Sequence, residues 1–153
     1  MLISNLISES SIVANLPGLN KEQVLANLAY ALAEALPKAD PERILEALQE
    51  RERLGSTGIG KGIAIPHGRC VWIKKPVAVF GRSVEGVDFA ANDGKPVHLF
   101  IALLSPVRAV KPHLKALSAI SQLLNHQTRR KKLLAAADEK ALYDALIMGE
   151  KEG

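Results

Sequence analysis

His67 lies between a proline, which restricts the backbone before it, and a glycine, which has no side chain to obstruct the space after it. It follows the β-prone segment Ile63-Ala64-Ile65 and Pro66, whose ring fixes one backbone angle, and it precedes Gly68, which leaves room for close approach. A neutral imidazole is a nucleophile that can take up a phosphoryl group through a free ring nitrogen. The spacing therefore makes His67 the candidate phosphoryl acceptor, with a histidine in an ordinary turn as the alternative.

Two further polar side chains fall on helix faces that are otherwise apolar. Arg51 shares a predicted helix face with Ile44 and Leu48. A guanidinium buried without a partner is costly in free energy. We therefore expect the Arg51 side chain to form a structural salt bridge, to reach solvent, or to bind an anion. His113 lies on the inward face and in the first turn of another predicted helix, where free N–H groups and the dipole favour anions. A hydrogen-bonded core histidine is the alternative for His113.

The segment between Arg51 and His67 is rich in glycine and carries Ser56 and Thr57. Its hydroxyls and backbone amides could contact an anion, although the segment could equally be a plain connection. Phosphoryl transfer unites all these residues, because its transition state spreads charge over equatorial oxygens that need donors. We expect Arg51 and His113 to contact those oxygens, with Ser56, Thr57 and Gly68 as further phosphate-binding positions. Cationic side chains would neutralise the charge, so neither a metal nor a cofactor is expected.

Other chemistries fit the sequence less well. It has no Gly-x-x-x-x-Gly-Lys-Ser/Thr motif of a nucleotide-binding loop and no Gly-x-Ser-x-Gly motif of a hydrolase. The four histidines are too scattered for a zinc site, and we interpret His98 and His126 as structural. The basic run Arg129-Arg130-Lys131-Lys132 predicts a solvated helix face, with a nucleic-acid patch as the alternative.

The composition is that of one soluble globular domain. Apolar residues make up 48% of the chain, charged residues 24%, and the formal net charge is +4. A single cysteine, Cys70, excludes an internal disulfide, and neither a secretory signal nor a membrane-spanning apolar run is present. We expect a cytoplasmic protein without membrane insertion and without nucleic-acid binding.

Hydrophobic periodicity predicts helices alternating with short strands. Residues 97–104 form a nearly continuous apolar run, which is typical of a strand covered on both faces. Helices flanking such a buried sheet make an α/β domain, and no linker divides the chain. The predicted helices are 20–36 and 40–53, with Asn20 and Asp40 as their N-caps, one opening near Pro112, 128–136 and 138–148. The predicted strands are 12–13, 63–65, 77–82 and 97–104.

The run RERLGSTGIGKGIAIPHG, from Arg51 to Gly68, resembles the active-site signature of phosphotransferase-system enzyme IIA domains of the fructose/mannitol type, and most closely their nitrogen-regulatory branch. Residues 86–89 and 96–106 and the position of His113 also resemble that family. The resemblance covers nearly the whole chain. It implies a mixed, mostly parallel sheet of about five strands flanked by helices, forming a single type-2 EIIA domain over residues 1–153.

The resemblance also implies a function. His67 would be phosphorylated on its Nε2 (tele) nitrogen, and Arg51 and His113 match the family's phosphate-site arginine and second histidine. The donor would be an HPr-like phosphocarrier protein, itself charged by an enzyme I from phosphoenolpyruvate. Such a protein carries a phosphoryl group rather than turning over a small molecule by itself.

Nitrogen-regulatory members stand alone and bind targets such as potassium-transport regulators or sensor kinases according to their phosphorylation state. The alternative is a free-standing sugar-transport component that passes the phosphoryl group to an enzyme IIB domain.

Overall fold

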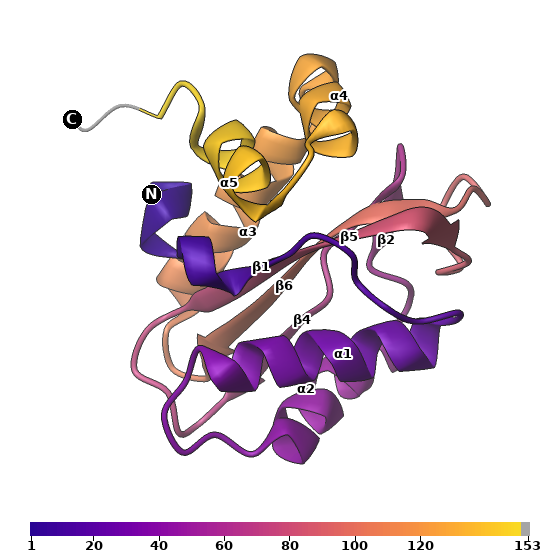
Figure 1. The fold of residues 1–153 in the computed structure, drawn as a ribbon. Coiled ribbons are helices and arrows are strands. Elements are labelled where there is room, and N and C mark those ends of the chain that lie inside the picture. Colours follow the sequence, from indigo (N-terminus) through magenta and orange to yellow (C-terminus); the bar gives the residue numbers. More distant parts are fainter. Residues whose placement is uncertain (151–153) are drawn as a thin grey trace.

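The computed structural model describes residues 1–150 (Figure 1). Its helical elements are the short 3-10 turns η1 (Ile3–Asn5) and η2 (Glu9–Ser11) and the helices α1 (Lys21–Glu34), α2 (Pro41–Arg53), α3 (Val110–Leu124), α4 (Gln127–Ala135) and α5 (Glu139–Ile147). Its strands are β1 (Ile12–Val13), β2 (Gly58–Gly60), β3 (Ile63–Ala64), β4 (His67–Cys70), β5 (Val77–Val87) and β6 (Val97–Pro106).

The six strands form one mixed sheet in the order β1-β5-β6-β3-β2, with β4 also paired to β6. Strands β1 and β5 are parallel, and β6 is parallel to β3 and β4 but antiparallel to β5. The predicted α/β class is confirmed, and the sheet has one strand more than the expected five. Strand β6 lies in the middle of the sheet, and nearly all of its side chains are buried, on both faces, which explains the unbroken apolar run at residues 97–104.

Helices cover both faces of this sheet (Figure 1). Alternate residues of the central strands point to opposite faces, so Phe100 packs with Leu32 and Leu48 of α1 and α2, whereas Ile101 packs with Ile120 of α3. Helices α4 and α5 and the N-terminal turns complete the second side. The last turn of α2, the start of β4 and the first turn of α3 lie around one pocket.

The helix boundaries follow the capping signals in the sequence. Asn20 accepts a hydrogen bond from the backbone N–H of Gln23, and Asp40 accepts one from Glu42 with Pro41 in the first turn. Both predicted caps are therefore confirmed. Helix α3 begins at Val110 rather than near Pro112, so the proline lies inside the first turn, where its missing N–H costs no helical hydrogen bond.

The sequence failed to predict two strands, β2 and β4. Strand β2 lies in the glycine-rich segment and pairs antiparallel with β3. Strand β4 starts at His67 itself and pairs with β6, with His67 opposite Leu103. Both strands are too short to show a period of their own, and they exist because a neighbouring strand supplies the hydrogen bonds.

The basic run on α4 is not one solvated face. The Arg129 guanidinium donates to the carbonyl oxygens of Ala145 (2.6 Å) and Met148 (2.9 Å) at the end of α5. Arg130 donates to the carbonyl of Leu124 at 2.9 Å. The prediction of a continuous solvated face is therefore wrong for these two arginines, because their donors satisfy carbonyls at helix ends.

Arg82 is a buried arginine on β5 that no sequence motif marked. Its guanidinium donates to the carbonyls of Ala14 (3.1 Å), Leu133 (2.9 Å) and Ala136 (2.6 Å). These bonds tie the end of α4 and the segment after β1 to the sheet.

Candidate functional site

A pocket of about 350 Å³ contains the three candidate residues for phosphoryl transfer. Arg51 enters it from the last turn of α2, His67 from the start of β4 and His113 from the first turn of α3. The structure therefore brings together side chains that lie far apart in the sequence. The lining residues are Ala47, Glu50, Arg51, Leu54, His67, Gly68, Arg69 and His113.

The His67 ring is fixed by a backbone carbonyl just upstream. Its Nδ1 lies 2.8 Å from the carbonyl oxygen of Ile65. A carbonyl only accepts hydrogen bonds, so Nδ1 carries the proton and donates, and the neutral ring keeps its lone pair on Nε2. Burial lowers the pKa of His67; the Ile65 carbonyl opposes this shift, and the charge of Arg51 adds to it. Near pH 7 the side chain is a neutral nucleophile with its free nitrogen at Nε2.

His113 lies beside His67 and is almost completely buried, with 6% of its surface exposed. The two ring centroids are 5.6 Å apart, and the planes are tilted by 48°. Its Nδ1 lies 2.6 Å from the hydroxyl oxygen of Ser105. Burial, assisted by the nearby His67 and Arg69, lowers the pKa of His113 to about 4. His113 is therefore neutral at physiological pH and can act as a hydrogen-bond donor or acceptor.

The lowered pKa of His113 makes stability depend on pH. The unfolded chain takes up a proton on this imidazole near pH 6.5, whereas the folded chain resists protonation down to about pH 4. The contribution of neutral His113 to the free energy of unfolding is therefore fully present above pH 6.5, and it is lost as the pH drops from 6.5 to 4. At about 1.4 kcal/mol per pKa unit, the loss is roughly 3 kcal/mol.

Urea unfolding at a series of pH values measures this effect. We expect the stability advantage of wild type over His113→Asn, which cannot titrate there, to shrink by roughly 3 kcal/mol from pH 6.5 to pH 4. Parallel pH profiles for the two proteins would contradict a neutral, buried His113.

Arg51 forms a hydrogen bond at the end of its own helix and also lines the pocket. Its Nη1 donates to the carbonyl of Gly55 at 3.0 Å, just past the end of α2. A guanidinium has five N–H donors, so this bond orients the group and leaves other donors for an anion. Arg51 therefore stands in the pocket as a positioned cation.

Arg69 is a pocket residue that sequence reasoning missed. It follows His67 by two positions on β4, so both side chains project from the same face of the strand. Its Nη2 donates to the carbonyls of Pro106 (3.3 Å) and Val107 (2.5 Å), and its Nε is buried without a hydrogen-bond partner in residues 1–150. The spacing His67-x-Arg69 could have indicated that both side chains share one face of a strand. It does so only if residues 67–70 are recognised as a strand, which the sequence did not predict.

Ser56 and Thr57 do not line this pocket. The Ser56 hydroxyl donates to the carbonyl of Phe89 at 2.6 Å, and the Thr57 hydroxyl donates to the carboxylate of Glu52. Thr57 is also buried. The two hydroxyls therefore bind the loop to the segment after β5 and to the end of α2.

Several backbone amides of the glycine-rich segment are also occupied. The N–H of Thr57 donates to Glu52 at 3.2 Å, that of Gly58 to the Ser56 hydroxyl at 3.0 Å, and that of Lys61 to Asp93. These three amides are therefore not free to contact an anion, because acceptors within the chain already satisfy them.

Gly68 permits a close contact between β4 and α2. A Cβ atom at this position would lie 2.9 Å from both the carbonyl carbon and the carbonyl oxygen of Ala47. The missing side chain thus lets α2 approach β4, and this packing brings Arg51 near His67. Gly68 also lines the pocket, as expected for a phosphate-binding position, and its tight contact is with the chain's own helix.

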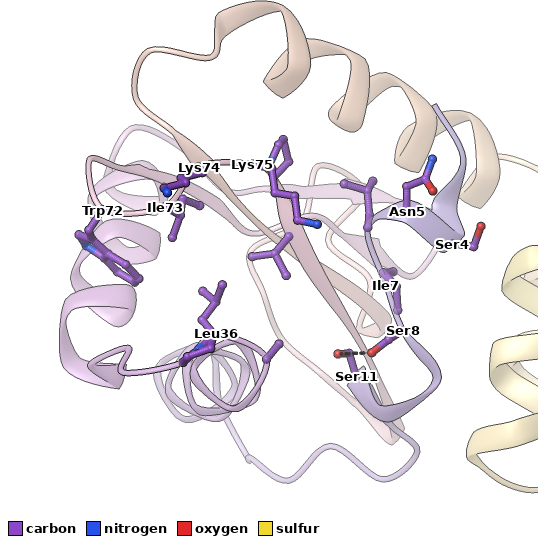
Figure 2. Close-up of a pocket in the computed structure, with 15 residues that line it drawn as sticks. Ser4, Asn5, Ile7, Ser8, Ser11, Leu36, Trp72, Ile73, Lys74 and Lys75 are labelled. Atoms are coloured by element: carbon purple, nitrogen blue, oxygen red, sulfur yellow. Dashed lines mark hydrogen bonds between the residues drawn. The ribbon is translucent and has the colours of Figure 1, made fainter.

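A larger cavity of about 750 Å³ lies elsewhere, between the N-terminal segment, the end of α1 and the loop before β5 (Figure 2). Its polar groups include Ser8 and Ser11, whose hydroxyl oxygens are 3.1 Å apart, and the lysines 74 and 75. None of the predicted site residues lines it. In residues 1–150 no three or more His, Cys, Asp or Glu side chains are grouped to hold a metal ion. The same part of the chain has no helix long and apolar enough to cross a membrane.

Comparison with known proteins shows relatives of two kinds. A nitrogen regulatory protein of Bradyrhizobium diazoefficiens is 39% identical over 148 residues, which cover 97% of this chain and 96% of that protein. The fructose-specific EIIABC component of Bacillus subtilis is 38% identical over 151 residues, but the matched part is 99% of this chain and only 24% of that protein.

The fold has a matching solved structure and a matching family. The crystal structure of nitrogen regulatory protein IIA-Ntr from Neisseria meningitidis superposes with a TM-score of 0.87 at 33% identity, covering 94% of this chain and 98% of that one. The model of the family "phosphoenolpyruvate-dependent sugar phosphotransferase system, EIIA 2" matches residues 5–148. The chain therefore belongs to the EIIA 2 family of the phosphoenolpyruvate-dependent sugar phosphotransferase system.

Proposed function

We propose that this protein is a nitrogen-regulatory phosphocarrier that accepts a phosphoryl group on Nε2 of His67. One observation carries the proposal: a neutral His67, with Nδ1–H bound to the Ile65 carbonyl, stands in a pocket with Arg51 and His113. The catalytic residues in this proposal are His67, Arg51 and His113. Ser56 and Thr57 hold the loop, and Gly68 holds the packing of β4 against α2.

The transfer step needs no group beyond the donor phosphohistidine. The Nε2 lone pair of His67 attacks phosphorus, the new P–N bond forms as the P–N bond to the donor's imidazole breaks, and that imidazole leaves with the electron pair. The His67 ring gains positive charge, which the Ile65 carbonyl stabilises through Nδ1–H. The guanidinium of Arg51 neutralises charge on the equatorial phosphoryl oxygens.

The surface around the pocket favours a protein donor over a small molecule. Leu54 lines the pocket and is 84% exposed, and Leu114, the residue after His113, is 58% exposed. Val107 is also exposed and borders an adjoining hollow that shares Arg69 with this pocket. Exposed apolar side chains around a polar centre are typical of a protein-binding surface. We propose an HPr-like phosphocarrier as the donor, and the single domain of residues 1–153 as the unit it binds.

Regulation would result from the charge that the transfer adds. A phosphoryl group brings roughly two negative charges to the surface near Arg51 and Arg69. Target proteins such as potassium-transport regulators or sensor kinases would then distinguish the two states electrostatically. The near full-length match to a nitrogen regulatory protein supports this assignment, and we place the reaction in the cytoplasm with the other phosphotransferase components.

The test is phosphorylation by a reconstituted chain of donors. Purified protein is incubated with labelled phosphoenolpyruvate, enzyme I and an HPr-like phosphocarrier. We expect about one phosphoryl group per chain, labile to acid and stable to base as a phosphohistidine is, and dependent on both added proteins. An unlabelled protein, or a label that survives acid, would contradict the proposal.

The second candidate is a sugar-transport IIA component, favoured by the match of nearly the whole chain to part of a fructose-specific EIIABC protein. The two candidates share the acceptance step and differ in where the phosphoryl group goes next. Transfer from the phosphorylated protein to a fructose-type IIB domain would support sugar transport. Phosphorylation-dependent binding to a regulatory protein, with no transfer to IIB, would support regulation. A neighbouring IIB/IIC permease gene or a neighbouring nitrogen sigma-factor gene would discriminate in the same way.

A further inference from the structure

Ser105 is a fully buried serine near the end of β6 that does not line the pocket. Its hydroxyl oxygen lies 2.6 Å from Nδ1 of His113, and the residue is 0% exposed. No other side-chain hydrogen bond of Ser105 occurs in residues 1–150. The hydroxyl and the imidazole therefore depend on each other.

Only one placement of the protons satisfies both groups. If Nδ1 of His113 carried the proton and donated to Ser105, the serine's own hydroxyl proton would be buried without an acceptor, which carries the full cost of its desolvation. If Ser105 donates instead, Nδ1 accepts, and the neutral ring carries its proton on Nε2. In the second placement the Ser105 hydroxyl has an acceptor, and Nε2 of His113 is not among the fully buried unpaired atoms of residues 1–150.

We propose that Ser105 is the positioning residue that fixes His113 as the Nε2–H tautomer, so that Nε2 can donate a hydrogen bond to a phosphoryl oxygen on His67. This inference rests on the proposed phosphocarrier function. It assigns opposite tautomers to the two neighbouring rings. The Ile65 carbonyl leaves a lone pair on Nε2 of His67, and the Ser105 hydroxyl leaves a proton on Nε2 of His113.

The choice of tautomer matters because His113 is neutral and has only one ring proton to offer. Its pKa is lowered to about 4, so a second proton is absent at pH 7. With the proton on Nδ1, the ring would turn a lone pair toward the phosphoryl oxygens and repel them. With the proton on Nε2, the ring stabilises the same oxygens.

Nitrogen NMR of the unphosphorylated protein tests the tautomer directly. Two-bond proton–nitrogen correlations at pH 7 should show Nε2–H for His113 and Nδ1–H for His67. Ser105→Ala should give a mixture of tautomers at His113 and leave His67 unchanged, whereas Ser105→Thr, which keeps the hydroxyl, should retain the wild-type tautomer. An Nδ1–H tautomer at His113 in wild type, or an unchanged tautomer in Ser105→Ala, would overturn the proposal.

Transfer kinetics give the second readout. We expect Ser105→Ala to slow phosphoryl transfer about tenfold, with Ser105→Thr restoring the rate, since part of a hydrogen-bond donor's contribution is lost. Equal rates in wild type and Ser105→Ala would overturn the role in transfer. A wild-type protein that accepts no phosphoryl group would instead refute the phosphocarrier function, while the NMR measurement would still decide whether Ser105 sets the tautomer.

Discussion

Replacing His67 with glutamine is expected to abolish phosphoryl acceptance, with a loss of at least about 1000-fold, since the reacting atom itself is removed. A glutamine amide nitrogen has no available lone pair and cannot form the P–N bond. The side chain is only partly buried, so the fold should persist with a change of about 1 kcal/mol or less in the free energy of unfolding. The measurement is the rate of labelling from the phosphorylated HPr-like donor, monitored with donor in excess.

The matched control is His126→Gln. His126 is exposed and lies outside the pocket, at the residue before α4. This variant should accept the phosphoryl group at the wild-type rate. Labelling of His67→Gln at a rate near that of this control would place the acceptor elsewhere in the chain.

Arg51→Ala is expected to slow transfer about 100-fold, as removal of one transition-state hydrogen-bond donor does in enzymes. The truncation removes a cation from the pocket along with the hydrogen bond to the Gly55 carbonyl. That lost hydrogen bond should cost only about 1 kcal/mol of stability. Arg51→Lys, which keeps the charge but loses the planar fork, should give an intermediate rate.

The matched control is Arg53→Ala, which removes an exposed arginine from the same helix turn without touching the pocket. Its transfer rate should stay within about twofold of wild type, because a surface charge outside the pocket acts only through screened attraction. A large fall in melting temperature with normal transfer in Arg51→Ala would show that this arginine is only structural.

The sequence predicted the parts of the molecule that depend on local signals. The caps Asn20 and Asp40 lie where their side chains accept backbone N–H groups, and the apolar run at 97–104 is the central strand β6. Arg51 and His113 each stood on an apolar helix face without an obvious reason. A shared pocket with His67 supplies that reason, and it unites residues from three elements that are distant in the sequence.

The features that the sequence did not predict depend on contacts between distant segments. Strand β4 exists because β6 offers hydrogen bonds, and without it the pairing of His67 with Arg69 on one strand face is invisible. Arg129 looked like a surface charge because the carbonyls that it satisfies belong to another helix. Thr57 looked available to an anion because its acceptor, Glu52, is a long side chain that folds back over the loop.

Phosphorus–nitrogen NMR of the phosphorylated protein, labelled with nitrogen-15 in its histidines, identifies the atom that carries the phosphoryl group. We expect a one-bond coupling between phosphorus and Nε2 of His67, with Nδ1 of the same ring still protonated and bound to the Ile65 carbonyl. A coupling to Nδ1 of His67, or to either nitrogen of His113, would contradict the assignment of Nε2 of His67 as the phosphoryl acceptor.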